Sequence, residues 1–307
     1  MAHWFDIIHE PPVEFGVDRY SLPTRVSIET CSACNRRCSF CPAGRKPVKN
    51  ELMTDEVFNS VVAALADVKF DGVVQMFLEN EPLLDPELLN RANAIREACP
   101  RCTIYVSTNF DVMSHDPVHW LCRMRAAGIT TINMNAYPSG PDHWELIQAT
   151  VKEALTCGFE FADNKYRRKN PKRCYVVGED MRNPTGLVNK IWARGERVVP
   201  THKRCGRVFR QLGVMWDGRV PCCPCTDPRA DWVPKVGQLP QDYLWDLWNS
   251  EQMFKMRYFL QQGRRAVEPC MTCDGTMAYS HVVRRVTAAE DTVRRWEDEA
   301  ENSNAGR

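Results

Sequence analysis

Short apolar segments alternate with amphipathic helical patterns between residues 25 and 178, and this alternation limits the folds that the chain can adopt. Strands are predicted at residues 25–30, 72–78, 103–108, 130–135, 159–164 and 173–178. Helices are predicted between them at residues 54–68, 86–98, 117–128 and 143–158. Repeated strand–helix units form a parallel sheet that helices cover. The pattern therefore predicts an α/β fold, a partial (β/α)6 TIM-like barrel, with its chemistry beyond the carboxyl ends of the strands.

The composition changes near residue 200. Residues 212–223, LGVMWDGRVPCC, contain an Asp-Gly pair that is typical of a tight hairpin turn. A Trp-rich amphipathic segment at 243–260 and a Cys-x-x-Cys pair at 270–273 follow. We therefore predict a small Cys-rich module, a β-hairpin plus a helix. The predicted parts are an N-terminal extension at 1–24, the partial barrel at 25–200, the module at 201–280 and a charged helical tail at 281–307.

The bulk composition argues against some partners. A formal net charge of +1, with 26% charged residues, gives no reason to expect a nucleic acid or an anionic membrane. No apolar stretch is long enough to cross a bilayer. The first residues, MAHWFDIIHEPP, lack the basic region and apolar core of a signal peptide. A cytoplasmic location is expected.

The sequence has 15 cysteines, an odd number that argues against a disulfide framework in a chain without export signals. Cys122 and Cys157 lie among the apolar residues of helical patterns and are interpreted as ordinary buried cysteines. Two other groups are too closely clustered for that interpretation. One lies at residues 31–41 and the other at residues 205–273.

The first group is the loop CNRRCSFC, which follows the first predicted strand and contains Cys34, Cys38 and Cys41. Structural metal sites usually close with four ligands. Zinc, with Cys31 as a fourth ligand, is one interpretation. Zinc sites favour paired Cys-x-x-Cys units or Cys/His mixtures, however, and no histidine lies nearby. Three thiolates instead suit three irons of a [4Fe–4S] cluster, whose fourth iron then stays open.

The spacing C-x3-C-x2-C, with the aromatic Phe40 before the last cysteine, resembles the signature of the radical S-adenosylmethionine (radical SAM) superfamily. The resemblance implies that the amino and carboxylate groups of SAM bind the open iron. One electron from the cluster then cleaves SAM to methionine and a 5′-deoxyadenosyl radical, which removes a hydrogen atom from an unactivated carbon. An electron donor such as flavodoxin or ferredoxin is the implied partner.

Two strand ends carry residues that match SAM-binding positions of this family. The second strand is followed by Glu81, beside Asn80, where the family has a carboxylate that holds the SAM amino group. An acidic loop before a helix is the alternative interpretation. The third strand ends in Ser107, Thr108 and Asn109. In the family, polar residues at this strand end contact the ribose and methionine parts of SAM.

The sequence departs from the family at the end of the third strand, where Phe110 replaces a common glycine. On the fourth strand, Asn133 and Asn135 alternate with Met134, so the two amides lie on one face. We expect that face to line a cavity that binds the cofactor. Hydrogen bonds to neighbouring backbone are the alternative role for these amides.

The second group consists of Cys205, Cys222, Cys223, Cys225, Cys270 and Cys273. A hairpin would bring Cys205 and Cys223 together, and the later Cys-x-x-Cys pair could close a four-sulfur site for an iron–sulfur cluster or zinc. The pattern resembles the SPASM extension of radical SAM enzymes in its shortened form, the twitch domain. The resemblance implies one auxiliary [4Fe–4S] cluster, with ligands Cys205, Cys223, Cys270 and Cys273, or with Cys222 in place of Cys223.

The substrate is less constrained than the reaction. Little sequence precedes the first predicted strand, so a small polar substrate is favoured over a peptide. Relatives with a single auxiliary cluster imply oxidation or epimerisation of a sugar- or aminocyclitol-like metabolite, by a dehydrogenase or an epimerase. Cys225 is a candidate hydrogen donor, or else a spare cysteine. Modification of a ribosomally made peptide is the alternative reaction, and an iron–sulfur electron carrier or a zinc-stabilised binding protein is the non-enzyme alternative.

Overall fold

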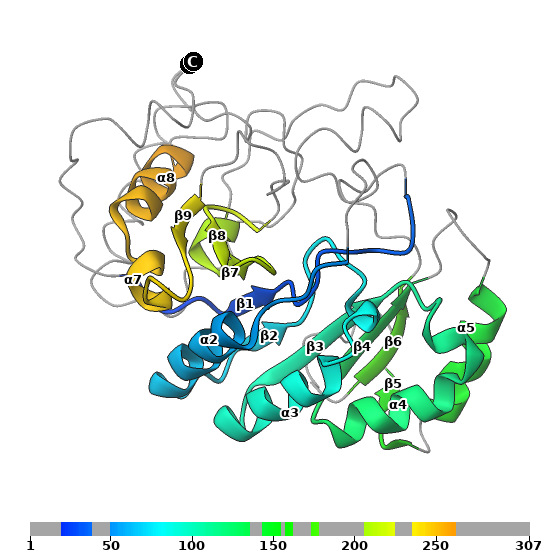
Figure 1. Ribbon diagram of the computed structural model, residues 1–307. Helices are drawn as coiled ribbons and strands as arrows, with labels where there is room; N and C mark the ends of the chain where they lie inside the picture. The colour runs from blue at the N-terminus through cyan, green and yellow to red at the C-terminus, as the bar shows by residue number, and fades with distance from the viewer. Residues whose placement is uncertain are drawn as a thin grey trace, which may run out of the picture.

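Seven parallel strands form the central sheet, in the order β5-β6-β4-β3-β2-β1-β7 (Figure 1). The computed structural model describes residues 20–38, 50–135, 143–154, 157–161, 173–177, 206–224 and 235–261. The strands are β1 Arg25–Ile28, β2 Val73–Gln75, β3 Thr103–Thr108, β4 Thr131–Asn135, β5 Glu160–Phe161, β6 Arg173–Val177 and β7 Gln211–Val214. The sheet is open, with β5 and β7 as its edges. It confirms the predicted partial barrel of α/β class.

Four helices follow the first four strands, and Figure 1 shows them along one face of the sheet. They are α2 Asp55–Asp67, α3 Leu88–Ala98, α4 Pro117–Ala126 and α5 Trp144–Ala154. α2 begins where the Thr54 side chain accepts a hydrogen bond from the backbone N–H of Val57. α4 begins in the same way, because Asp116 accepts from the N–H of His119. Such caps satisfy N–H groups that the first helical turn leaves unpaired.

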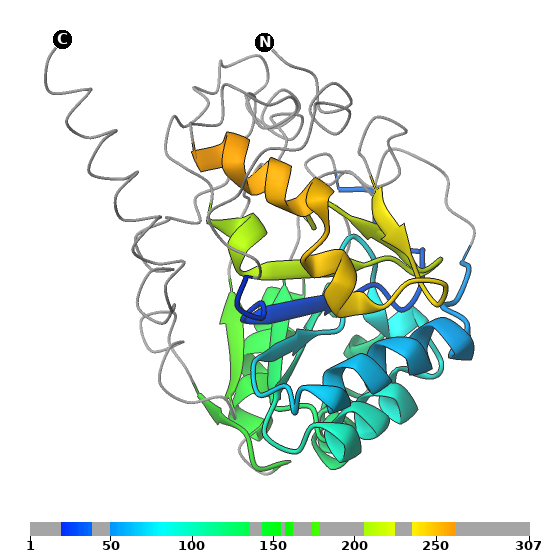
Figure 2. The same ribbon diagram turned by 90° about the vertical axis from the view of Figure 1, so that its left-hand side faces the viewer.

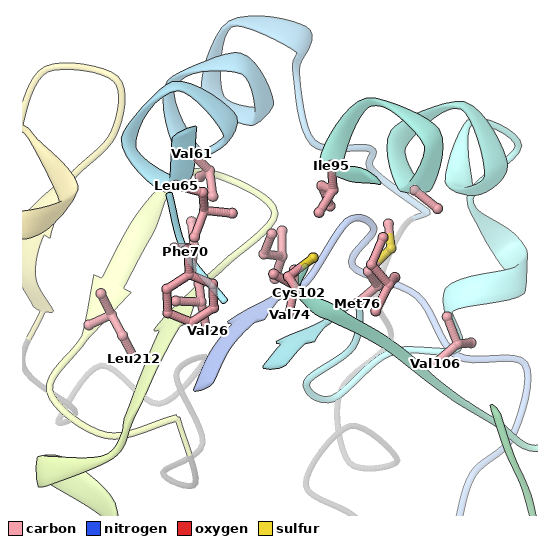
Figure 3. Packing of buried hydrophobic residues seen from close by; sticks show 14 of the residues in the cluster. Val26, Val61, Leu65, Phe70, Val74, Met76, Ile95, Cys102, Val106 and Leu212 are labelled. Atoms are coloured by element: carbon pink, nitrogen blue, oxygen red, sulfur yellow. The ribbon is translucent and has the colours of Figure 1, made fainter. Parts of the chain in front are cut away.

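The face of the sheet that the helices cover is apolar (Figure 3). Val26 on β1 and Val74 on β2 are fully buried there, under Leu65 of α2 and Ile95 of α3. Successive side chains on a strand point to opposite faces, so the neighbours of these residues point away from the helices. The opposite face carries mostly polar side chains. The apolar face therefore forms the core, and the polar face is left for a site.

The order of the last strands differs from a barrel built in chain order, in which the fifth strand would lie beside the fourth. In the structure β6 pairs with β4 along the whole of β4, and β5 takes the edge. Each of the five residues of β4 has a partner on β6, so this pairing satisfies backbone hydrogen-bonding groups along the whole of β4. The alternation of strands and helices in the sequence does not determine this choice.

β7 lies in the segment assigned to the small module, yet it pairs with β1 in the main sheet (Figure 2). The predicted turn follows it, with the N–H of Gly218 donating to the carbonyl of Met215 at 2.9 Å. Beyond the turn, β8 Arg219–Pro221 pairs antiparallel with β9 Lys235–Gln238. The two strands that flank the turn therefore belong to different sheets, and the turn connects the barrel to the C-terminal strands.

The Trp-rich segment forms two helices, α7 Leu244–Trp248 and α8 Glu251–Gln261. The two tryptophans of α7 attach this part of the chain to the barrel. Nε1 of Trp245 donates to the carbonyl of Ala64 on α2 at 2.6 Å. Nε1 of Trp248 donates to the carbonyl of Ser21, just before β1, at 2.8 Å. Both indoles thus bury their rings and satisfy their N–H groups, as buried tryptophans require.

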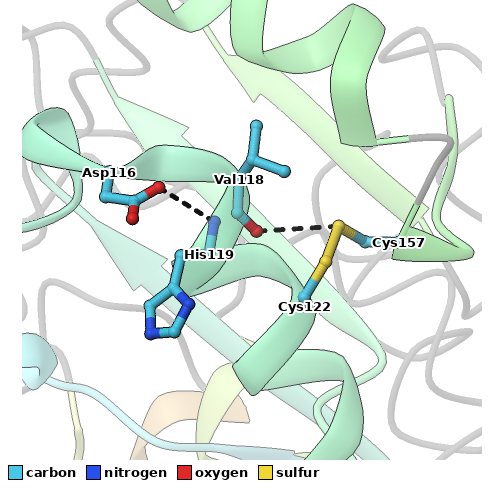
Figure 4. Close-up of a disulfide and its surroundings, with 5 residues drawn as sticks. All are labelled: Asp116, Val118, His119, Cys122 and Cys157. Carbon is cyan, nitrogen blue, oxygen red and sulfur yellow. Dashed lines mark hydrogen bonds between the residues drawn. A yellow bond between two sulfur atoms is a disulfide. The ribbon is translucent and has the colours of Figure 1, made fainter.

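The interpretation of Cys122 and Cys157 as separate buried cysteines is wrong, because the two form a disulfide (Figure 4). Cys122 is an exposed residue of α4, and Cys157 is half-buried. Leu121 and Met124 form the buried stripe of α4, and Cys122 lies about 100° around the helix from Leu121. The sequence did not reveal the pairing because 35 positions separate the cysteines.

Among the described residues, no helix combines the length and the apolar character that crossing a membrane requires.

The turn at Gly218 predicts a stability difference between two glycine variants. Gly218 has φ +85°, and a Cβ there would overlap the backbone oxygen of Leu239. Gly158 has φ +78°, and a Cβ there would meet only Nε of Arg125, at 3.8 Å. Each alanine variant loses about 1 kcal/mol for the left-handed backbone. Gly218→Ala should lose about 1–3 kcal/mol more, because the backbone at Leu239 must move.

The measurement is the midpoint of thermal unfolding of the two variants, purified anaerobically beside the unchanged protein. A markedly lower midpoint for Gly218→Ala than for Gly158→Ala is expected. Equal midpoints would show that the chain at Leu239 does not pack against this turn.

Candidate functional site

Two of the three predicted cluster ligands lie in the described part of the loop after β1. Cys34 is half-buried and Cys38 is buried. The Cys34 sulfur accepts hydrogen bonds from the backbone N–H of Arg36 at 3.5 Å and from Nδ2 of Asn109 at 3.8 Å. Burial raises the pKa of the Cys34 thiol. The other predicted residues of this loop, Phe40 and Cys41, lie outside the described residues.

Glu81 lies beside this loop at the end of β2, and its carboxylate is buried. One oxygen accepts from the Thr108 hydroxyl at 2.7 Å and from the N–H of Leu83 at 3.2 Å. The other accepts from the N–H of Asn109 at 2.7 Å. The N–H of Glu81 in turn donates to the carbonyl of Ala33 at 2.9 Å. Despite these donors, burial raises the pKa of Glu81 to about 7.

Asn80 is the other predicted residue of this motif, and both polar atoms of its side chain form hydrogen bonds with neighbouring residues. Its Nδ2 donates to the sulfur of Cys31 at 3.3 Å, and its Oδ1 accepts from the N–H of Leu78 at 3.1 Å. The Cys31 thiol also donates to the carbonyl of Glu81 at 3.5 Å. Burial raises the pKa of Cys31 to about 12, which favours the neutral thiol. These contacts favour a structural role for Cys31 over that of a metal ligand.

Asn109 and Phe110 form a tight turn at the end of β3. Nδ2 of Asn109 donates to Oδ1 of Asn35 at 2.7 Å, which places Asn109 against the cluster loop. Oδ1 of Asn109 accepts from the N–H of Asp111 at 3.0 Å. Phe110 has φ +73°, a conformation that favours glycine. Phe110 therefore takes a backbone conformation suited to the glycine that the family often has, and burial of its ring offsets the strain.

The buried amides of Asn133 and Asn135 form one network with the half-buried Ser107 at the ends of β3 and β4. Nδ2 of Asn133 donates to the Ser107 hydroxyl and to Oδ1 of Asn135, both at 3.1 Å. Nδ2 of Asn135 donates to the same hydroxyl at 2.9 Å and to the carbonyl of Thr108 at 3.0 Å. Oδ1 of Asn133 is buried and accepts no hydrogen bond from the described residues. The network thus has one acceptor available for a donor group.

Other polar side chains lie on the same face of the sheet, opposite the helices, between β2 and β7. We call this face the inner face. Nη1 of Arg25 donates to Oε1 of Gln75 at 3.1 Å, linking β1 to β2. Nε2 of Gln211 donates to the hydroxyl of Ser27 at 2.8 Å, linking β7 to β1. Ser27, Gln75 and Gln211 are all buried. Among the described residues, the face opposite the helices therefore presents amides, hydroxyls and the Arg25 guanidinium, beside the packed rings of Phe77 and Tyr105.

The second cysteine group is mostly outside the described residues, where Cys205, Cys225, Cys270 and Cys273 lie. Cys222 and Cys223 directly follow β8, and both are buried. Burial raises the pKa of Cys222 well above its usual value. In the part of the chain that the structure describes, no three histidine, cysteine or carboxylate side chains are arranged to hold a metal ion.

Sequence reasoning missed Asp111, whose carboxylate contacts the cluster loop. It pairs with Arg36 through two hydrogen bonds, of 2.9 and 2.6 Å. It also accepts from Nδ2 of Asn35 at 3.1 Å and lies 2.8 Å from Nε2 of His143. The Arg36 guanidinium keeps the pKa of Asp111 below its usual range. The sequence marked Asp111 only as an acidic residue two positions after Asn109. Many loops have an acidic residue near a strand end, so this pattern did not distinguish it.

Two family models match the chain. The model of the radical SAM superfamily matches residues 28–173. A model described as an iron–sulfur cluster-binding domain, SPASM, matches residues 205–274. Together they cover more than half of the chain. No curated protein matches it in sequence.

Solved structures of similar fold include two radical SAM proteins. BtrN, in complex with AdoMet and 2-DOIA, is 18% identical, with a TM-score of 0.67 over 85% of this chain and 96% of BtrN. The protein anSMEcpe, with bound AdoMet and the Cp18Cys peptide, is 13% identical, with a TM-score of 0.52 over 91% of this chain and 99% of anSMEcpe. At such identities the likeness concerns the fold alone.

The open parallel sheet, the cysteine loop after β1 and both family matches agree. The chain belongs to the radical SAM superfamily, uses a [4Fe–4S] cluster and SAM as cofactors, and carries a C-terminal iron–sulfur cluster-binding domain of SPASM type.

Proposed function

We propose that the protein removes a hydrogen atom from a carbon of a small polar substrate, sugar- or aminocyclitol-like, and so oxidises or epimerises it. The observation that carries this proposal is the polar inner face of the sheet. Its network of Ser107, Asn133 and Asn135 keeps an acceptor at Asn133 without a donor among the described residues. Buried polar groups need partners, and a substrate hydroxyl or amine is a suitable one.

The residues at the strand ends fit the cofactors of the family. Cys34 and Cys38 offer soft sulfur donors, and with Cys41 they would hold the cluster. When bound, the cluster and SAM supply the one-electron chemistry that breaks an unactivated C–H bond. Glu81 would hold the SAM amino group through a charge-assisted hydrogen bond. Asn109, between Glu81 and the loop, would orient the methionine and ribose parts, and Phe40 would pack beside them.

The polar inner face connects to this cofactor site through Thr108. The carbonyl of Thr108 accepts from Asn135, and its hydroxyl donates to Glu81. We assign Asn133 and Asn135, expected from the sequence to bind the cofactor, to the substrate instead, which would therefore lie next to the SAM site. Such adjacency is what direct hydrogen transfer from substrate to cofactor requires. Asn80 would have a supporting role, because its hydrogen bond to the Cys31 sulfur ties the loop after β2 to the end of β1.

We assign the C-terminal module one auxiliary [4Fe–4S] cluster with ligands Cys205, Cys223, Cys270 and Cys273, with Cys222 as the alternative to Cys223. This cluster would accept the electron left on the substrate after hydrogen removal in an oxidation. In an epimerisation, the Cys225 thiol would instead give its hydrogen atom to the other face of the carbon, and the resulting thiyl radical would regain the thiol by taking up one electron from the one-electron donor and one proton. A one-electron donor such as flavodoxin or ferredoxin would reduce the SAM-binding cluster.

Cluster variants should separate the two iron sites. After anaerobic reconstitution, the protein should hold about eight irons per chain and form 5′-deoxyadenosine from SAM on reduction. Cys34→Ala and Cys38→Ala should keep about half of that iron and form no 5′-deoxyadenosine. Cys99→Ala, at a buried cysteine on the helix face of the sheet, is the control and should behave as the unchanged protein. If Cys34→Ala formed as much 5′-deoxyadenosine as the unchanged protein, Cys34 would not be a ligand of the SAM-binding cluster.

SAM binding should depend on pH through Glu81. Because burial raises its pKa to about 7, Glu81 is mostly the neutral acid at lower pH and is then a weaker acceptor for the N–H of the iron-bound SAM amino group. The affinity for SAM should fall roughly five- to tenfold between about pH 7.5 and pH 6. Glu81→Gln should bind roughly 10- to 100-fold more weakly at pH 7.5, with little change over this range.

Titration calorimetry of the reconstituted protein measures both effects. Glu56→Gln, at an exposed acid in the first turn of α2, is the matched control and should keep the pH dependence. A Glu81→Gln variant with the unchanged protein's affinity would mean that another group holds the SAM amino group.

The product distinguishes the reactions. A panel of aminocyclitols and amino sugars, incubated in deuterated water, should yield either a carbonyl product without solvent label or an inverted carbon that carries one deuterium. In the second case, Cys225→Ala should abolish the inversion while 5′-deoxyadenosine still forms. Turnover of a peptide panel, with none of the polar metabolites consumed, would overturn the substrate class.

A further inference from the structure

We propose that Asp111 is a positioning residue for the SAM-binding cluster. Its carboxylate binds Asn35 and Arg36, two of the three residues between Cys34 and Cys38, and lies beside His143, so it connects this loop to the turn after β3 and to the start of α5. The inference rests on the proposed function only in taking Cys34 and Cys38 as cluster ligands. It concerns a residue outside the predicted signature and outside the SAM-binding positions discussed above.

Both carboxylate oxygens of Asp111 are engaged on the loop. Oδ2 accepts from Nε of Arg36 at 2.9 Å and from Nδ2 of Asn35 at 3.1 Å. Oδ1 accepts from Nη2 of Arg36 at 2.6 Å. The Arg36 side chain is 2% exposed and that of Asp111 is 19% exposed. A bidentate pair that is so shielded fixes direction as well as distance, and it is disrupted at high cost when one partner is removed.

The turn after β3 aims Asp111 at the loop. The N–H of Asp111 donates to Oδ1 of Asn109 at 3.0 Å, and the N–H of Phe110 donates to the Thr108 hydroxyl at 3.0 Å. Phe110 holds the left-handed backbone conformation with its ring fully buried. Four consecutive residues, 108–111, thus form a rigid turn whose last side chain meets the cluster loop.

His143 extends the contact to a third loop. Its Nε2 lies 2.8 Å from Oδ1 of Asp111, and its ring lies against Phe110 with centroids 5.6 Å apart. His143 directly precedes α5, which follows β4. Asp111 therefore joins the loops that follow β1, β3 and β4. A cluster held by loop cysteines depends on such support, because the groups that orient ligands control how firmly the metal is held.

The same arrangement reaches the sulfur of Cys34. The backbone N–H of Arg36 donates to it at 3.5 Å, and Asn109, which is bonded to Asn35 and Asp111, donates at 3.8 Å. Hydrogen bonds to cluster sulfurs tune an iron–sulfur site. Loss of the Asp111 carboxylate would remove two hydrogen bonds that orient Arg36, whose backbone N–H faces Cys34.

The test measures iron release from the reconstituted full-length protein to a chelator, with the electron paramagnetic resonance (EPR) spectrum of each cluster recorded in parallel. Asp111→Asn should release the iron of the cluster whose EPR signal responds to SAM at least fivefold faster. The auxiliary cluster should release its iron at an unchanged rate. Asp116→Asn, at the exposed cap of α4, is the matched control and should match the unchanged protein.

A double-variant cycle separates a specific pair from general damage. Arg36→Ala should also accelerate release, and the combined variant should be clearly slower than the product of the two single effects, because the two side chains share one pair of hydrogen bonds. Unchanged release from Asp111→Asn, or additive effects in the combined variant, would overturn the inference. If Asp111→Asn does not fold, Arg36→Lys decides, because it keeps the charge and loses the bidentate geometry. Faster iron release from Arg36→Lys would support the role of the Asp111–Arg36 pair, and an unchanged rate would refute it.

Failure of the proposed substrate class would leave these iron-release rates unchanged, whereas failure of the cluster assignment would look different. In that case the unchanged protein would show no SAM-responsive EPR signal, and Cys34→Ala would retain all of its iron. A SAM-responsive cluster that is indifferent to Asp111 would overturn this inference alone.

Discussion

The buried carboxylate of Glu81 joins the loops that follow three strands. Its backbone N–H bonds to Ala33 in the loop after β1, while its two oxygens accept from Thr108 and Asn109 at the end of β3. Burying a charge is costly unless it is paired and hydrogen-bonded. The donors around Glu81 offset part of that cost, and burial still raises its pKa to about 7. The site is therefore organised around a carboxylate that a cation would stabilise.

The rest of the fold places these loops together at the carboxyl-terminal edge of the sheet. Apolar side chains on alternate positions of each strand bind the sheet to α2, α3 and α4, which leaves the polar positions on the opposite face. Parallel pairing places the carboxyl ends of β1, β2 and β3 side by side. The cysteine loop, Glu81 and the turn at Asn109 then meet without any long insertion. The Asp111–Arg36 pair adds a second connection at the same edge.

Local sequence patterns predicted most of the barrel. The apolar runs located β1 to β4 within a few residues, because strand and helix periodicities differ and every element here buries one face. Glu81 and the strand end at Asn109 were predicted because a family motif places polar groups at fixed points after strands. The structure puts both beside Cys34.

Features that depend on distant pairs were not predictable in this way. The pairing of β7 with β1 joins residues about 186 positions apart, and the pairing of β4 with β6 also passes over the strand that comes next in the chain, β5. The Cys122–Cys157 bond depends on how α4 packs beside the end of α5. Asp111 and Arg36 are charged loop residues like many others in the sequence, and only the fold makes them a buried pair.

The central claim is that SAM completes the three-cysteine cluster at this edge, with its amino group beside Glu81. Electron–nuclear double resonance on the reduced cluster, with SAM labelled with 15N at its amino group, tests it most directly. A hyperfine coupling from the label is predicted, because the amino group would bind the open iron. A cluster that forms and is reduced but shows no coupling to labelled SAM would contradict the account.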